Sequence, residues 1–304
     1  MDIEIVAEGL AFPEGPVWMK DGSVVVVEIA AGQVTRIRPN GDKELVAECG
    51  GGPNGAAVGP DGCLYVVNNG GMSFSRQDGL LVTDGGASAD SKPGWVDRID
   101  ANSGRIERLY EGVDGRPLAG PNDLVFDRDG GMWFSDMGKH AGSSTENGGI
   151  YYAKADGSFV TRVVDGVRAN GMGLSPDGKK LYCALSYEAL LVEFDIDGPG
   201  LLSPVAGFAS GRPIGQFAPR QLPDSLAVDA NGHVCCATVF NNAGITSVDP
   251  QSGRLTHQPF PDLMTTNICF GGADMRDAWV TLSSTGRLAK VRWDSPGLEL
   301  AYYA

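Results

Sequence analysis

The chain has 304 residues, of which 42% are hydrophobic and 20% charged, a composition typical of a globular protein. Its formal net charge of −14 at pH 7 argues against nucleic acids and anionic membranes as partners, because an acidic surface repels phosphate groups. No stretch approaches the roughly 20 apolar residues that a membrane helix needs, so no membrane span is expected.

The start of the chain, Met1-Asp2-Ile3-Glu4, has no basic segment followed by an apolar run, so no secretory leader is expected. The six cysteines form neither a Cys-x-x-Cys pair nor a regular framework, which indicates free thiols in a reducing compartment. We therefore expect a cytoplasmic protein. The sequence carries no signal for its oligomeric state.

The chain begins with an alternating apolar and polar run at residues 3–8, which predicts a strand. Further on, short runs of β-branched and aromatic residues are separated by turn signals. Clear examples are residues 23–27, 64–67, 132–134, 180–182 and 278–280. Many short strands with glycine-rich turns favour a sandwich, a barrel or a propeller.

Six repeats decide between these architectures. Each has a polar residue, an apolar strand, a tight turn and a second apolar strand. The repeats begin at Pro13, Pro53, Pro121, Ala169, Pro223 and Thr266. The first five contain the hairpin signatures Asp21-Gly22, Asp61-Gly62, Asp129-Gly130, Asp177-Gly178 and Asn231-Gly232, and the sixth has a longer turn at residues 274–277. Their spacing suits four-stranded blades, which predicts an all-β fold: a six-bladed β-propeller.

The two ends of the chain fit this prediction. After the last hairpin only one further strand is evident, at residues 286–292, so the final blade is one strand short. The N-terminal strand at residues 3–8 is expected to join the last blade, which closes the ring and removes an exposed edge. No segment has the composition of a linker, so residues 1–304 are expected to form a single domain.

An insertion separates the second repeat from the third. It covers roughly residues 70–97 and is rich in Gly, Ser and Asp, with apolar side chains at Met72, Phe74 and Trp95. Such a loop is either passive or a lid that faces the substrate, because apolar side chains in a polar loop need a surface to pack on.

The polar residue at the start of each repeat is the candidate site. In a propeller the innermost strand of each blade lines the axis, so these positions face one mouth of the channel. The six ring residues, as we call them, are Glu14, Asn54, Asn122, Asn170, Asp224 and Asn267.

Asn and Asp also cap turns, but each repeat has a separate hairpin turn further on. Carboxylate and amide oxygens suit hard divalent cations, and two facing carboxylates are costly to bury without one. We therefore predict a polar axial site.

Other chemistries find little support in the sequence. No histidine occupies a ring position and no Cys/His cluster occurs, which disfavours a conventional zinc site. His140 follows the third hairpin, where it could overhang the mouth and contact a substrate. The chain has no Gly-x-Ser-x-Gly nucleophile motif, and no phosphate-binding or dinucleotide fingerprint.

The chain resembles the SMP-30/gluconolactonase family, also called regucalcin-like or LRE-like proteins. The motifs that carry the resemblance follow one another in order over nearly the whole chain. They are residues 12–18 (Phe-Pro-Glu-Gly-Pro-Val-Trp), residues 120–124 (Gly-Pro-Asn-Asp-Leu), residues 133–136 (Trp-Phe-Ser-Asp), Asn170-Gly171, Pro223-Asp224 and residues 266–272.

This resemblance implies a divalent metal ion bound by Glu14, Asn170 and Asp224. It also implies that Asn122 touches the substrate or a metal-bound water, and that the reaction is hydrolysis of a lactone. Asn54 and Asp136 fit the same pocket by position. Some sugar lactonases of the family have an arginine two residues before the asparagine corresponding to Asn122. This chain has Gly120 there, so that sugar contact does not carry over.

These residues suggest a mechanism in which the metal polarises the lactone carbonyl, a water attacks, and Asp224 acts as the general base. Ca²⁺ is the expected ion, and Mg²⁺, Mn²⁺, Zn²⁺ and Fe²⁺ also suit such a site. The expected activity is that of a hydrolase that acts on the carboxylic ester bond of a small-molecule lactone. Two alternatives stay open: a metal-dependent hydrolase for another ester or an organophosphate, and a non-catalytic calcium-binding propeller.

Overall fold

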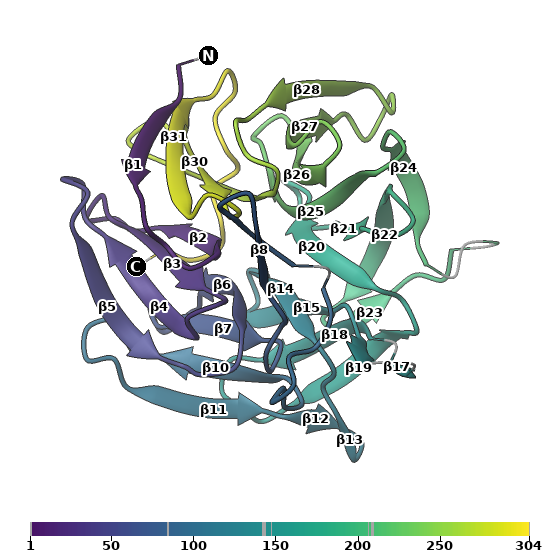
Figure 1. The fold of residues 1–304 in the computed structure, drawn as a ribbon. Coiled ribbons are helices and arrows are strands. Elements are labelled where there is room, and N and C mark those ends of the chain that lie inside the picture. Colours follow the sequence, from purple (N-terminus) through teal and green to yellow (C-terminus); the bar gives the residue numbers. More distant parts are fainter. Residues whose placement is uncertain are drawn as a thin grey trace.

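The computed structural model describes residues 2–83, 85–141, 144–146, 148–205, 207 and 210–303. Within these ranges the chain forms strands and connecting turns but no helix, and so no helix that could cross a bilayer. Six antiparallel sheets of four or five strands are arranged as blades round a central axis (Figure 1). The predicted six-bladed β-propeller is therefore confirmed.

The first three blades each run from an inner strand to an outer strand. Blade 1 consists of β2 (Pro13–Trp18), β3 (Val24–Glu28), β4 (Gln33–Ile37) and β5 (Lys43–Glu48). Blade 2 consists of β6 (Pro53–Val58), β7 (Leu64–Asn68), β10 (Trp95–Ile99) and β11 (Ile106–Tyr110). Blade 3 consists of β14 (Pro121–Phe126), β15 (Gly131–Asp136), β18 (Gly149–Lys154) and β19 (Val160–Asp165).

The other three blades follow the same order. Blade 4 consists of β20 (Ala169–Leu174), β21 (Lys180–Leu185), β22 (Leu190–Gly198) and β24 (Arg212–Gln216), with the short β23 (Leu201–Leu202) also on β22. Blade 5 consists of β25 (Gln221–Val228), β26 (Val234–Phe240), β27 (Gly244–Val248) and β28 (Leu255–Pro259). Blade 6 consists of β29 (Thr265–Gly271), β30 (Asp277–Leu282), β31 (Arg287–Arg292) and β1 (Glu4–Ala7).

Three small hairpins project from the blades. They pair β8 (Ser75–Gln77) with β9 (Leu80–Val82), β12 (Gly112–Val113) with β13 (Arg116–Pro117), and β16 (Lys139–Ala141) with β17 (Ser144–Glu146). The first hairpin belongs to the predicted insertion. That insertion ends slightly earlier than expected, because Trp95 begins β10 and is buried in blade 2.

The N-terminal strand closes the ring as predicted. β1 pairs antiparallel with β31, with Glu4 opposite Lys290 and Ile5 opposite Ala289, so the two ends of the chain complete one blade (Figure 1). The edge of β31 is thereby covered. The hairpin turns are also as predicted, since Gly22, Gly62, Gly130, Gly178 and Gly232 all have φ between 70° and 86°.

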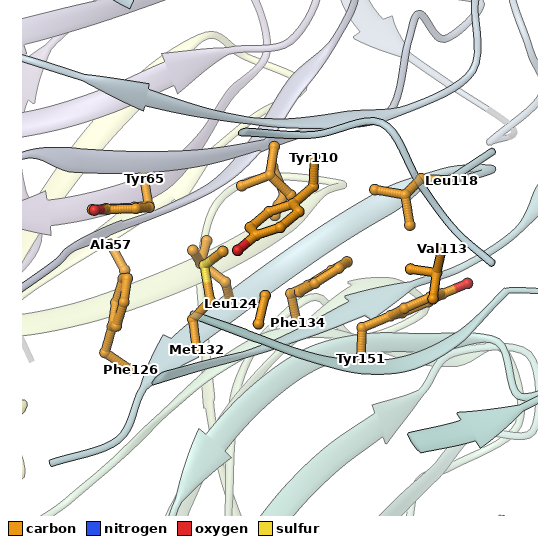
Figure 2. Packing of buried hydrophobic residues seen from close by; sticks show 13 residues of the cluster. Ala57, Tyr65, Tyr110, Val113, Leu118, Leu124, Phe126, Met132, Phe134 and Tyr151 are labelled. Carbon is orange, nitrogen blue, oxygen red and sulfur yellow. The ribbon is translucent and has the colours of Figure 1, made fainter. Parts of the chain in front are cut away.

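The core lies between neighbouring blades. Figure 2 shows one such layer, in which Tyr65 and Tyr110 of blade 2 face Phe126, Phe134 and Tyr151 of blade 3. The rings of Phe134 and Tyr151 are stacked with their centroids 4.9 Å apart. Because each blade packs its apolar face on the next, the inner strands are held rigidly round the axis.

Each inner strand has a β-bulge next to its ring residue. In each blade the pairing of the inner strand with its neighbour shifts register next to the ring residue; in blade 1, for example, the shift lies between Glu14 and Val17. Such a bulge re-aims a side chain that a regular strand would direct elsewhere.

Glycine after the ring residue allows adjacent inner strands to approach closely. A Cβ atom on Gly15, where φ is 48°, would lie 2.8 Å from the Asn54 carbonyl oxygen of the next blade. A Cβ atom on Gly171 would lie 2.5 Å from the Asp224 carbonyl oxygen. The Glu-Gly and Asn-Gly pairs in the sequence therefore bring the ring residues of successive blades together.

The far end of the channel is closed by the C-terminal segment. Residues 298–303 line a cavity of about 270 Å³ that lies on the axis below the ring residues. Leu298 N–H donates to the Val228 carbonyl at 2.9 Å, and the Tyr302 and Tyr303 rings lie edge-on to Phe126 and Trp18. The C-terminal segment therefore packs on the inner strands at the end of the channel away from the ring residues.

Candidate active site

The six ring residues occupy equivalent positions at the same end of the inner strands, one in each blade. Glu14, Asn54, Asn122, Asn170 and Asn267 are buried, with exposed fractions of 2% to 6%. Asp224 is the exception, because its side chain is partly exposed. The chain therefore gathers a ring of carboxylate and amide groups round its axis, and Asp224 is the least buried of the six residues.

Glu14 is held by two hydrogen bonds to the same carboxylate oxygen. Asn267 Nδ2 of blade 6 donates to Glu14 Oε2 at 2.6 Å, and the Gly15 N–H also donates to Oε2. In the described part of the chain, Oε1 accepts no hydrogen bond. Glu14 is thus fixed in orientation with one oxygen left for a ligand.

The ring carboxyl groups bind protons unusually tightly. Burial raises the pKa of Glu14 well above its usual value, and the nearby Asp224 charge raises it further. Burial also raises the pKa of Asp224 to about 7, although a hydrogen bond from Asn170 opposes the shift. A positive charge between the two groups would promote their ionisation, because a cation favours the charged form.

Two amide oxygens of the ring have no partner. Asn170 Nδ2 donates to Ser186 Oγ at 3.0 Å, and Asn122 Nδ2 donates to Met137 Sδ at 3.2 Å. The Oδ1 atoms of both asparagines are buried and accept no hydrogen bond from the residues that the structure describes. A buried carbonyl oxygen without a donor is unfavourable, so these two atoms are suited to a cation, a water or a substrate.

The donor set fits a hard divalent cation. Glu14 Oε1, Asn170 Oδ1 and the Asp224 carboxylate supply oxygen ligands of the kind that Ca²⁺ prefers. Among the residues described by the structure, no three His, Cys, Asp or Glu side chains are grouped to hold a metal. A cation here would therefore need amide oxygen and water in addition to the two carboxylates.

The other predicted substrate residues lie in different settings. Asn54 is buried at the start of β6, beside Glu14 in the ring. His140 lies in β16 and is half-buried, and its ring is edge-on to Tyr187 at a centroid distance of 6.2 Å. Direct contact of these residues with a substrate stays a prediction.

Asp136 lies behind the ring and holds the segment that leads into Asn122. It is fully buried; its Oδ1 accepts the Gly120 and Gly138 N–H groups at 2.8 and 2.7 Å, and its Oδ2 accepts the Ala119 N–H at 2.9 Å. These bonds fix the backbone just before Asn122. Asp136 thus supports the site through Asn122, and its predicted contact with substrate stays a prediction.

We expect an Asp136→Asn substitution to destabilise the protein by about 1.5–3 kcal/mol, because the new NH₂ group would face a backbone N–H. The free energy of unfolding in urea measures this loss, and kcat should fall because Asn122 loses its support. Asp100→Asn is the matched control. Both backbone bonds of Asp100 go to Oδ1, an atom that asparagine retains, so a change within about 0.5 kcal/mol is expected. Equal stability of the Asp136 variant and the wild type would contradict the assignment.

The insertion covers the mouth at which the ring residues lie. Phe74 packs on Phe12 of blade 1 at a centroid distance of 5.0 Å, and Leu81 N–H donates to the Ser284 carbonyl of blade 6 at 2.9 Å. On its return the insertion reaches blade 3, where Ala87 N–H donates to the His140 carbonyl at 3.0 Å. Figure 1 shows β8 across the centre of the ring. Of the two interpretations of this loop, the structure favours the lid.

Sequence reasoning missed two residues of the site. Asp123 is buried in blade 3, and its Oδ2 accepts the Met172 N–H of blade 4 at 3.0 Å; burial raises its pKa to about 7. Ser186 bridges blades 4 and 5, because its hydroxyl accepts from Asn170 and donates to the Pro223 carbonyl at 2.6 Å. Asp123 had a signal in the sequence: it stands where blades 1, 2 and 4 have glycine.

The chain is similar to proteins of known family. The SMP-30/Gluconolactonase/LRE-like region family matches residues 12–284. A gluconolactonase of Zymomonas mobilis is 24% identical over 298 residues, which is 88% of this chain and 76% of the relative.

Two solved structures resemble the whole molecule. A gluconolactonase of Xanthomonas campestris superimposes with a TM-score of 0.74 at 23% identity, covering 97% of this chain and 89% of that chain. A calcium-binding protein, regucalcin of Agrobacterium tumefaciens, gives a TM-score of 0.72 at 18% identity, covering 97% of each chain. At these identities the two structures support the propeller fold alone.

Proposed function

The chain belongs to the SMP-30/gluconolactonase/LRE-like family, and on this premise we propose that it is a metal-dependent lactone hydrolase. The observation that carries the proposal is the ring itself. Two carboxyl groups with raised pKa values, Glu14 and Asp224, accompany the buried Asn170 Oδ1 atom that lacks a partner. Such a group of oxygen atoms is favourable only with a cation among them. The gluconolactonase relatives supply the reaction class.

A divalent cation held by Glu14, Asn170 and Asp224 would supply Lewis-acid stabilisation of the negative charge that develops on the lactone carbonyl oxygen. Oxygen ligation favours Ca²⁺, and Mg²⁺, Mn²⁺, Zn²⁺ and Fe²⁺ suit the same donors. Glu14 anchors the site, because Asn267 and Gly15 fix its carboxylate in one orientation.

Asp224 acts as the general base, since burial raises its pKa to about 7 and a base works best with a pKa near the operating pH. The water oxygen bonds to the carbonyl carbon while one of its protons passes to Asp224. The ring C–O bond then breaks, and the proton passes from Asp224 to the leaving alkoxide oxygen. The net change is the addition of one water, which yields the open hydroxy acid. Asn122, whose amide Oδ1 has no other partner, orients the attacking water.

A panel of γ- and δ-lactones, read by acid release with a pH indicator, tests the proposal. The protein is assayed as purified, after chelation, and after single metals are added back. We expect hydrolysis that disappears with the chelator and returns with one metal. Hydrolysis that is insensitive to chelation would overturn the metal dependence. No hydrolysis of any lactone, with metal binding shown by calorimetry, would overturn the reaction class and leave the ester or organophosphate hydrolase and the non-catalytic propeller.

A further inference from the structure

Arg168 lies at the mouth of the channel above Asn170. It lies just before β20 and stands two residues before Asn170 in the chain. Arg168 Nε donates to the Met137 carbonyl at 3.1 Å, and Met137 Sδ accepts from Asn122 Nδ2. One short chain of contacts therefore joins this guanidinium to the ring.

The guanidinium is preorganised but not neutralised. Its carbon atom lies 3.9 Å from the centroid of the Tyr187 ring, a cation–π contact, and Tyr187 is 45% exposed. In the part of the chain that the structure describes, the two terminal nitrogens of Arg168 form neither a hydrogen bond nor an ion pair. The donors on its open edge are thus fixed in place without an acceptor.

Two other arginines that stack on aromatic rings serve as a comparison. Arg108 lies over Trp95 and pairs with Asp97 at 2.6 Å, and Arg162 lies over Tyr151 and pairs with Asp165 at 2.6 Å. Each stacked guanidinium elsewhere thus has a carboxylate of the chain as its partner. Arg168 alone among the three lacks one, and it is the one at the channel mouth.

We propose that Arg168, stacked on Tyr187, binds a carboxylate of the substrate, so that the preferred substrate is a lactone with an anionic group remote from its scissile carbonyl. This inference rests on the proposed lactone hydrolysis. The planar fork of a guanidinium matches the two oxygens of a carboxylate.

The charges at the mouth agree with this substrate class. The ring is acidic, and a divalent cation would balance Glu14 and Asp224. Arg168 then adds a positive charge that attracts an anion, although the chain as a whole carries −14. In the described structure Arg168 forms no ion pair with a ring carboxylate, so its charge is available to a group of the substrate other than the reacting carbonyl. Lactones of sugar diacids have such a group.

Two commercial lactones make a matched pair for the test. D-glucaro-1,4-lactone and D-glucono-1,4-lactone share one ring and differ at C6, which is a carboxylate in the first and a hydroxymethyl group in the second. For the wild type we expect kcat/KM to be at least about tenfold higher for the carboxylate substrate, the effect of one charge-assisted hydrogen-bonded pair. Arg168→Gln should lose this preference mainly through a higher KM for the carboxylate substrate, with a smaller fall in kcat/KM for the neutral lactone. Arg168→Lys should retain part of it.

Arg162→Gln is the control variant, because it removes a stacked arginine from the outer strand β19 and should leave the preference intact. Equal kcat/KM values of the wild type for the two lactones would overturn the inference. An equal loss of kcat/KM on both lactones in Arg168→Gln would also overturn it and make Arg168 a structural residue.

If neither lactone is hydrolysed, the wider lactone panel decides the proposed function, and a binding measurement decides the anion site. Calorimetry of the Ca²⁺-loaded protein with D-glucarate and D-gluconate should then show a preference for the diacid that Arg168→Gln abolishes. Equal affinities for the two acids would overturn the inference.

Discussion

An Asp224→Asn variant loses about 10²- to 10⁴-fold in kcat, because it removes the general base and keeps a side chain of the same size. Asparagine retains one oxygen as a ligand, so the cation should still bind, although more weakly. The propeller should also persist, because the raised pKa of Asp224 means that its charged form does not favour the folded state, and asparagine carries no charge.

Comparison with a Glu14→Gln variant separates the two roles. Glu14 anchors the cation, so its replacement should weaken metal affinity, and excess metal should restore part of the turnover. Excess metal should not rescue Asp224→Asn, since the proton acceptor itself is lost. Asp195→Asn, a half-exposed carboxylate on the outer part of β22, is the control and should retain full activity. Wild-type turnover in Asp224→Asn would disprove its role as the base.

The fold follows from the sequence because propellers repeat one local pattern. Each blade has its own hairpin turn and its own polar residue before the first strand, so six weak signals reinforce one another. Closure by residues 3–8 follows from counting strands, since the last repeat lacked one. The course of the insertion was not predictable in this way. Phe74 and Leu81 reach blades 1 and 6 through contacts across the ring that no local pattern encodes.

The ring positions were also visible in the sequence, but their surroundings were not. Asn122 and Asn170 occupy repeat positions, whereas the Met137 and Ser186 atoms that orient their amides come from loops and neighbouring strands. Arg168 appears in the sequence only as an arginine before Ala169-Asn170. Its importance depends on the lack of a carboxylate partner, which is a property of three-dimensional packing.

Removal of the metal is expected to abolish lactone hydrolysis and to lower the melting temperature. At a metal concentration of 100 times Kd, binding stabilises the folded state by about 2.7 kcal/mol. For a chain of this size that corresponds to a fall of roughly 4 °C on chelation. Scanning calorimetry with and without Ca²⁺ measures this difference in melting temperature. The Glu14→Gln variant should show only a small difference. A melting temperature that chelation leaves unchanged in the wild type would contradict the site.

The size of this shift should depend on pH. Folding raises the pKa values of Glu14, Asp224 and Asp123, so the metal-free folded protein holds protons that the unfolded chain releases. The stability that these three groups contribute is therefore fully present below about pH 4. The contributions of Asp224 and Asp123 are lost as the pH rises through about 7, and that of Glu14 is lost as the pH rises through its own raised pKa. A bound cation removes this cost by balancing the charges.

The gain in melting temperature on adding Ca²⁺ should consequently be larger at pH 8 than at pH 5. Surface carboxyl groups with lowered pKa values, such as those of Asp61, Asp177 and Asp274, stay ionised over this range and do not contribute. An equal gain at both pH values would show that the ring carboxylates are already ionised without metal, and a larger gain at pH 5 would place the cation elsewhere.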